Sequence, residues 1–96
     1  MAGMQGRRVH AKPGEELKPH TFQPGDYGYW EQAGAWYARA PDDPHGVLTA
    51  NLGGHNVIEH DDGTISVSPS ILVSYNGADA KCSWHGYLNR GVWTSC

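Results

Sequence analysis

The chain has 96 residues, of which 39% are hydrophobic and 18% are charged, and its formal net charge is −3. This length allows a single domain, and no stretch approaches the ~20 consecutive apolar residues of a membrane-spanning helix. The weakly acidic balance argues against direct nucleic-acid binding, which needs a basic surface. Arg7 and Arg8 are not followed by an apolar run, so the sequence predicts no secretory signal.

The composition favours strands and turns. The chain contains 13 Gly and 6 Pro, together with 4 Trp and 5 Tyr. Glycine and proline are typical of turns, and aromatic residues are enriched in strands. No window of ten or more positions shows apolar residues at helical spacing. We therefore predict a mainly β fold: a small antiparallel sandwich or partly open barrel of about seven or eight short strands, with an extended N-terminal arm.

Residues 1–26 are predicted to form this arm. The segment is slightly basic, contains Pro13, Pro19 and Pro24, and has few large apolar residues. It cannot bury enough apolar surface to fold alone. We expect a short edge strand near residues 20–23, and we expect the arm to be held either by the body of the domain or by a partner. Residues 27–96 are then the compact β domain, which carries the acidic charge.

In chain order, the domain begins with an aromatic hairpin whose connection, residues 31–34, contains glycine. Prolines and aspartates at 41–46 predict a turn. In the last strand of this half, Val57 and Glu59 share one face and Ile58 lies on the other, with Asn56 and His60. The strands predicted in this half span residues 27–30, 35–37, 47–51 and 55–60.

Turn signals also divide the second half. Asp61-Asp62-Gly63 predicts a tight hairpin turn, and residues 76–77, Asn-Gly, predict another. Pro69 cannot donate a hydrogen bond to a ladder, so residues 68–70 should form a bend or an edge. A three-residue loop at 89–91 should close the last hairpin. The predicted strands span residues 64–67, 71–75, 83–88 and 92–95.

The two cysteines leave three states open. Cys82 and Cys96 are inert thiols if the protein stays in a reducing cytosol, a disulfide if the last hairpin brings them together, or metal ligands. Cys82 and His85 have the two-residue separation of a zinc knuckle, and Cys96 with His55 or His60 would complete a tetrahedral set. Zinc is the one cofactor that these residues suggest. Otherwise we expect His85 to be a partly buried residue that bonds to the backbone.

Patterns of common catalytic sites are missing. There is no Gly-x-Ser-x-Gly elbow, and the paired carboxylates fall in predicted turns, where Asp is common. A nucleophile and base would have to come from Cys82 with His85, or from Ser68 or Ser70 with a histidine. We therefore expect a protein that is not an enzyme.

The aromatic residues are the best candidates for binding. Their number exceeds what the core of so small a domain holds, and exposed Trp and Tyr often anchor protein interfaces. The alternative is that the N-terminal arm covers them. The candidate binding residues are Tyr27, Tyr29, Trp30, Trp36, Tyr37, Trp84 and Trp93.

Two pairs of motifs carry a family resemblance. They are Asp62-Gly63-Thr64-Ile65 with Ser68-Pro69-Ser70-Ile71, and Trp84-His85-Gly86-Tyr87-Leu88 with Gly91-Val92-Trp93. Through these motifs, residues 47–94 resemble a family of small uncharacterised proteins encoded largely in bacteriophages and prophages. The resemblance implies a phage context, in the cytoplasm of an infected bacterium or in the virion, and no activity. It also implies zinc at a Cys-x-x-His in the last hairpin, which Cys82 and His85 match, although the further cysteines of the family are absent.

The functional expectation is a phage accessory protein that binds a bacterial host or phage protein. Inhibition of a host defence component, in the manner of an anti-CRISPR protein, is the favoured role. Two alternatives stay open: a virion protein that decorates or cements the capsid or tail, and a zinc-stabilised module or zinc hydrolase. Homo-oligomerisation is also left open.

Overall fold

The computed structural model describes residues 3–41, 49–74 and 83–95. Among these residues are nine strands and one short 3-10 helix, η1 (Pro19–Thr21). The strands are β1 (Met4–Gln5), β2 (Arg7–Arg8), β3 (Asp26–Trp30), β4 (Ala35–Ala38), β5 (Ala50–Asn51), β6 (Asn56–Glu59), β7 (Ile65–Ser74), β8 (Ser83–Asn89) and β9 (Val92–Ser95). No helix in this part of the chain is long and apolar enough to cross a membrane.

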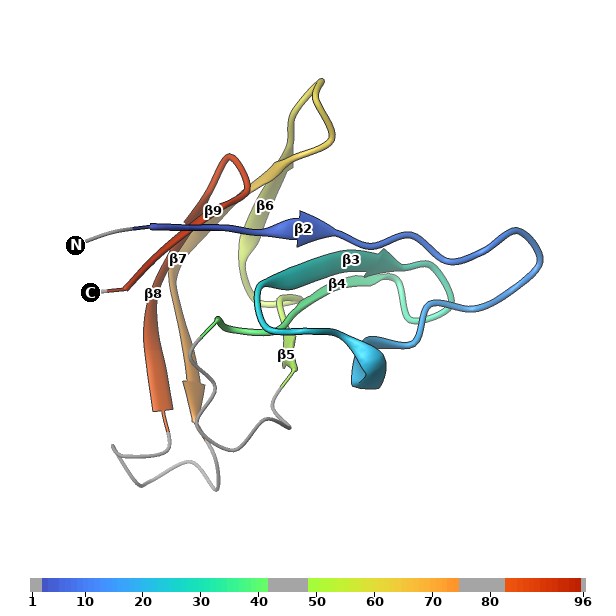
Figure 1. Ribbon diagram of the computed structural model, residues 1–96, viewed down its shortest axis with the longest axis horizontal. Helices are drawn as coiled ribbons and strands as arrows, with labels where there is room; N and C mark the ends of the chain where they lie inside the picture. Colours follow the sequence, from blue (N-terminus) through green and yellow to red (C-terminus); the bar gives the residue numbers. More distant parts are fainter. Residues whose placement is uncertain (1–2, 42–48, 75–82, 96) are drawn as a thin grey trace.

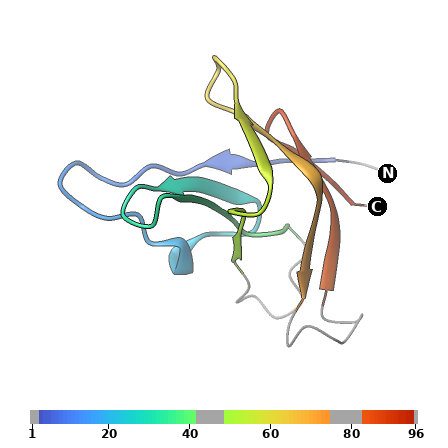
Figure 2. The ribbon, with the colours of Figure 1, turned by 180° about the vertical axis from the view of Figure 1, so that it is seen from behind.

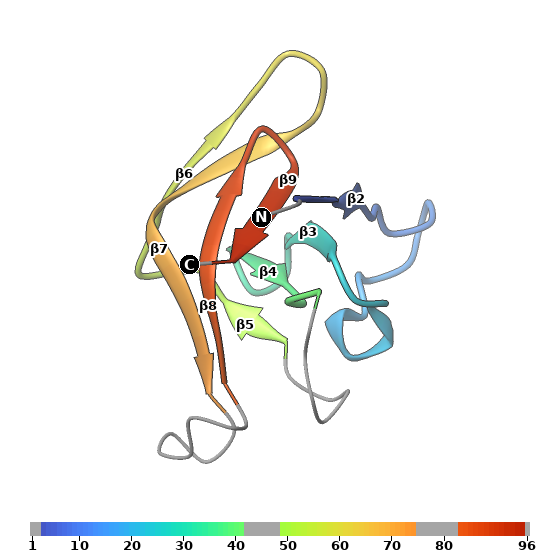
Figure 3. The same ribbon diagram turned by 60° about the vertical axis from the view of Figure 1, so that its left-hand side comes forward.

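The strands form two sheets that lie against each other without closing into a barrel (Figures 1 and 3). One sheet has the order β1-β9-β8-β7-β6, and the other has the order β2-β3-β4-β5. All strand pairs are antiparallel except β2 and β3, which are parallel. The predicted mainly β fold is therefore confirmed, with one parallel pair that the sequence did not indicate.

Turn chemistry places the hairpins. Gly63 ends the β6–β7 turn with a φ of 87°, and the Asp62 carboxylate accepts hydrogen bonds from the Thr64 N–H at 3.0 Å and from its hydroxyl at 2.6 Å. The β8–β9 hairpin differs from the prediction. Its loop has two residues, Arg90 and Gly91, with φ angles of 49° and 78°, because the preceding residue still pairs with β9. Two consecutive positive φ angles are typical of a type I′ turn.

Pro69 does not end its strand. β7 continues through it, and the register with β8 shifts between Val67 and Ile71. A residue without an N–H is tolerated at such an irregularity because no ladder bond is required of it.

The N-terminal arm is held by the body of the domain. β1 pairs with β9 and β2 pairs with β3, so the arm crosses from one sheet to the other at Gly6 (Figures 1 and 2). The Gly6 N–H donates to the Gly91 carbonyl at 2.7 Å. The Arg7 guanidinium donates two bonds to the buried Asp26 carboxylate, at 3.2 and 2.9 Å.

The short strand predicted at residues 20–23 is not formed. Residues 19–21 form η1 instead, with Pro19 in its first turn. Proline fixes φ near the helical value and its missing N–H costs nothing there. The Thr21 hydroxyl and N–H both donate to the Lys18 carbonyl, which closes the turn.

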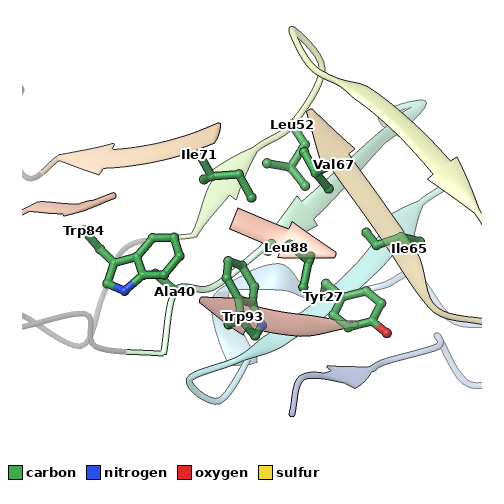
Figure 4. Packing of buried hydrophobic residues seen from close by; sticks show 10 residues of the cluster. Tyr27, Ala40, Leu52, Ile65, Val67, Ile71, Trp84, Leu88 and Trp93 are labelled. Carbon is green, nitrogen blue, oxygen red and sulfur yellow. The ribbon is translucent and has the colours of Figure 1, made fainter. Parts of the chain in front are cut away.

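The core lies between the two sheets, where side chains from both point toward one another (Figure 4). Trp93 and Trp84 meet edge to face with ring centroids 5.3 Å apart. The Trp93 indole N–H donates to the Gly25 carbonyl at 2.9 Å. The buried cluster consists of Tyr27, Ala38, Ala40, Leu52, Ile65, Val67, Ile71, Trp84, Leu88 and Trp93.

Several predicted features lie outside the described residues. They are most of the turn at 41–46, the turn at 76–77, and both cysteines, Cys82 and Cys96. The predicted thiol, disulfide and zinc states of the cysteines therefore stay predictions.

Candidate protein-binding surface

Three of the seven predicted binding aromatics belong to the core. Tyr27 and Trp93 are each 1% exposed and Trp84 is 6% exposed. Their rings point between the two sheets, so they have almost no surface to offer a partner (Figure 4). The sequence-based prediction overestimated how many aromatic rings the core would leave exposed, because two sheets packed face to face bury large rings well.

The other four lie on the β3–β4 hairpin. Tyr29 is 41% exposed, and the other three are half-buried. Tyr29 packs edge to face on Trp36, and Trp30 packs in the same way on Tyr37, both with centroids 5.4 Å apart.

The arm contacts both faces of this hairpin. The Trp30 indole N–H donates to the Glu16 carboxylate at 2.8 Å, and the Arg8 guanidinium lies 4.9 Å from the centre of the Trp36 ring. Tyr29 lines a hollow of about 320 Å³ beside the arm. The arm therefore covers part of the predicted aromatic surface and leaves Tyr29 as its most accessible ring.

A different surface is more exposed. Ile58 on β6 is 59% exposed and Tyr87 on β8 is 51% exposed. Both lie on the outer face of the five-stranded sheet. Tyr87 alternates with buried residues along β8, and Ile58 pairs with Ser66, which alternates with buried residues along β7. Between them, β7 presents the short side chains of Ser66 and Ser68. These four residues, with Thr94 on β9, line a hollow of about 530 Å³ that we call the outer groove.

The sequence contains a weak signal for the outer groove. Ile58 shares its predicted face with Asn56 and His60, so it is an apolar residue on a polar face. Tyr87 likewise shares a face with the polar His85 and alternates with the buried positions of β8. The pattern does not show whether another element covers that face, and this is why sequence reasoning missed it.

The Ser66 hydroxyl joins the two hairpins at the polar end of the outer groove. It donates to Asn89 Oδ1 at 2.9 Å and accepts from the Arg90 N–H at 3.0 Å. His60 Nε2 lies 2.7 Å from the same oxygen. Because the single hydroxyl proton is directed to Asn89, His60 must donate from Nε2. His60 therefore acts as a structural donor here and not as a base toward Ser66.

Charged side chains surround this end. Glu59, His60, Asp61, Asp62 and Arg90 line a second hollow of about 410 Å³. The Glu59 carboxylate pairs with Arg8 at 2.6 Å. The pKa of Asp62 is lowered, first by the hydrogen bond from the Thr64 hydroxyl and then by that from its N–H. Asp61 is exposed and has no hydrogen bond or ion pair within the described part of the chain.

The two histidines predicted as zinc ligands meet at Ser70. His85 Nε2 lies 2.8 Å from the Ser70 hydroxyl, and His55 Nε2 lies 3.3 Å from the Ser70 carbonyl. A carbonyl only accepts, so this His55 nitrogen carries the proton and its lone pair is on Nδ1. That Nδ1 is buried and has no partner among the described residues. Zinc binding by His55 through Nδ1 would leave this bond in place, since a metal-bound histidine commonly donates from its other ring nitrogen to a carbonyl.

The surroundings of His85 differ from the prediction. The ring is exposed and bonds to a hydroxyl, whereas His55 is the half-buried histidine that bonds to the backbone. A residue on the outer face of β8 has no second layer above it, and this explains the exposure. In residues 3–41, 49–74 and 83–95, no three His, Cys, Asp or Glu side chains form a group that could hold a metal ion.

Ser70 and His85 are within reach for nucleophilic catalysis, which needs a base that contacts the nucleophile. Such a site also needs a group that orients the base and donors for an oxyanion. Of the described residues, only Ser70 is hydrogen-bonded to the His85 side chain. The contact between Ser70 and His85 is therefore a hydrogen bond on the surface of the sheet. That the protein is not an enzyme stays a prediction.

No match to this chain was found among family models, curated proteins or solved structures. The phage-family resemblance, and the setting it implies, therefore stay predictions.

Proposed function

We propose that this protein is a small binding domain that acts on another protein through the outer groove, without a chemical step. The exposure of Ile58 and Tyr87 supports this proposal. Within the described residues they are the two most exposed large hydrophobic side chains, and they flank one hollow. Interfaces are commonly anchored by an aromatic side chain in a desolvated pocket, ringed by polar residues. The outer groove has this composition.

The size of the effect can be bounded. Full burial of a large apolar side chain contributes about 1.5–3 kcal/mol, and Tyr87 begins 51% exposed. Burial of its exposed half by a partner therefore contributes about 0.8–1.5 kcal/mol, which corresponds to about a four- to tenfold change in Kd. Loss of the Tyr87 ring should be measurable in any binding assay.

The biological setting that we propose follows from the family resemblance. The partner is a bacterial host or phage protein, and the favoured role is inhibition of a host defence component, as an anti-CRISPR protein does. The weakly acidic charge of −3 is consistent with a protein target that presents a basic surface. Attachment to the virion is the alternative, and it predicts that mass spectrometry detects the protein in purified particles.

The test compares three tagged forms of the protein: wild type, Tyr87→Thr and Tyr29→Thr. Each variant removes one half-exposed tyrosine from a strand and keeps a residue that favours strands. We expect a partner that is retained from infected cells by the wild type and by Tyr29→Thr and is lost from Tyr87→Thr. Loss only from Tyr29→Thr would place the binding surface on the β3–β4 hairpin. Equal retention by all three forms would contradict the proposal.

Zinc is tested separately on the purified protein. His55 and His85 both contact Ser70, and this observation favours their belonging to one site. Elemental analysis that finds about one zinc per chain, lost in a His85→Ala variant, would support the zinc-stabilised alternative. A zinc content below about a tenth of an equivalent would remove it.

A further inference from the structure

We propose that the outer groove recognises a protein segment that carries an apolar side chain and, two to four residues away on either side, Lys or Arg. The inference rests on the proposed binding function and adds the chemistry of the partner. Two hollows carry it together: the outer groove, with its apolar walls, and the charged hollow at the hairpin turns.

The two hollows lie next to each other, because residues that line one contact residues that line the other. Ser66 and Asn89 line the outer groove, and His60 and Arg90 line the charged hollow. The Ser66 hydroxyl contacts the other three of these residues at 2.7–3.0 Å. The turns of the β6–β7 and β8–β9 hairpins also project at the same end of the molecule (Figures 1 and 3). A segment that lies in the outer groove and leaves toward this end meets the charged hollow next.

Negative charge predominates there. Three carboxylates, from Glu59, Asp61 and Asp62, line the hollow with one guanidinium, from Arg90. A second guanidinium, from Arg8, pairs with Glu59, so three negative and two positive groups leave one net negative charge. Glu59 is engaged by Arg8, and Asp62 accepts both of its described hydrogen bonds from Thr64. Asp61 has no such partner among the described residues and is exposed. It is therefore the carboxylate most available to an incoming cation.

The spacing sets where that cation must lie on the partner. Ile58 and Asp61 are three residues apart, and Asp61 lies in the turn after β6, so their Cα atoms are at most about 10 Å apart. An extended partner rises about 3.3 Å per residue, so its Lys or Arg should lie two to four positions from the apolar residue, on either side of it. A nucleic-acid backbone or an anionic lipid surface would be repelled by the same carboxylates.

The experiment selects peptides from a displayed library of random 12-residue sequences on the immobilised wild-type protein. Selected peptides are then measured against Tyr87→Thr, Asp61→Lys and Glu31→Lys. Glu31 lies at the exposed β3–β4 turn, on the other sheet, so Glu31→Lys changes the net charge as Asp61→Lys does and serves as its matched control. Asp61 has no positive φ, so the turn tolerates lysine. Circular dichroism checks that every variant is folded.

We expect enriched peptides with the predicted apolar and basic spacing. Their Kd should be unchanged with Glu31→Lys, higher by about two- to fivefold with Asp61→Lys at low salt, and higher by about four- to tenfold with Tyr87→Thr. At 1 M salt, where the screening length falls to about 3 Å, the effect of Asp61→Lys should vanish.

Other outcomes separate the two proposals. Peptides that need Tyr87 but show no basic preference overturn the inference about charge and leave the proposed function standing. Peptides that bind Tyr87→Thr as well as the wild type contradict both. Failure to enrich any peptide, or enrichment of acidic ones, also overturns the inference.

Discussion

Replacing Gly6 by alanine tests whether the N-terminal arm is an integral part of the fold. A Cβ at Gly6 would lie 2.8 Å from Trp93 Nε1 and 2.9 Å from the carbonyl oxygens of Gly25 and Gly91. All three distances are shorter than real Cβ contacts, and two of the atoms belong to the backbone. The arm must therefore move away from the crossing point between the two sheets.

The cost follows from the contacts that are lost. Movement of the arm breaks the bond from the Gly6 N–H to the Gly91 carbonyl and disturbs the indole bond of Trp93 to Gly25. Each hydrogen bond contributes about 1 kcal/mol, and overpacking in a tight site costs about 1–3 kcal/mol. We expect Gly6→Ala to lower the free energy of unfolding by about 2–4 kcal/mol, a large part of the 5–15 kcal/mol that is typical of small domains.

Urea unfolding followed by tryptophan fluorescence measures this change. With a slope of about 1–2 kcal/mol/M, the midpoint should fall by about 2 M. Gly54→Ala is the matched control, since a Cβ at Gly54 meets nothing within 4 Å. A Gly6→Ala midpoint equal to that of the wild type, with Gly54→Ala also unchanged, would refute the view that the arm is docked as described.

Three further predictions concern single side chains. Trp93→Phe should lower the free energy of unfolding by about 1–3 kcal/mol more than Trp84→Phe, because Trp93 loses a buried hydrogen bond whereas the Trp84 N–H has no partner among the described residues; paired urea titrations measure the difference. The hydrogen bonds from Thr64 hold the pKa of Asp62 below its ordinary 3.8. The stability that the carboxylate adds is therefore present above pH 3.8 and is lost as the pH falls through the lowered pKa of the folded protein. Asp62→Asn should lose less stability in acid than the wild type, and a parallel decline in both proteins would contradict this. Burial raises the pKa of Tyr27 above its ordinary 10.0, so stability should fall as the pH rises beyond 10.0; Tyr27→Phe should resist alkaline unfolding, and phenolate absorbance follows the titration.

The hairpins could be predicted from the sequence because their turn residues act locally. A turn forms at the predicted place, but it is not the two-residue turn that Asp-Gly indicates, in which both central residues have a positive φ. Gly63 has a φ of 87° whereas Asp62 has no positive φ, and the Gly63 N–H donates to the His60 carbonyl at 2.9 Å, so the loop has three residues. At the last hairpin the same reasoning located the turn but not its length. Arg90 adopts a left-handed φ of 49°, and its N–H is held by the hydroxyl of Ser66, 24 residues away in the chain. A contact of this kind cannot be found in a local pattern.

The aromatic residues show where pattern reasoning ends. Tyr27 and Tyr29 lie on the same face of β3, two residues apart, yet one is 1% exposed and the other is 41% exposed. Alternation assigns both to the same side of the sheet. It does not show how far the opposite sheet extends over that side. The core position of Tyr27 and the partial exposure of Tyr29 therefore became visible only in the packed structure.

The sequence by itself determined a small mainly β domain, the position of its turns, and an arm with too little apolar surface to fold alone. Those properties depend on local backbone preferences and on composition. The tertiary structure decided that the arm joins both sheets, with β2 parallel to β3, and that Ile58 and Tyr87 lie open on an uncovered face. These features depend on which segments, distant in the chain, cover one another, and burial of that kind is a property of the whole fold.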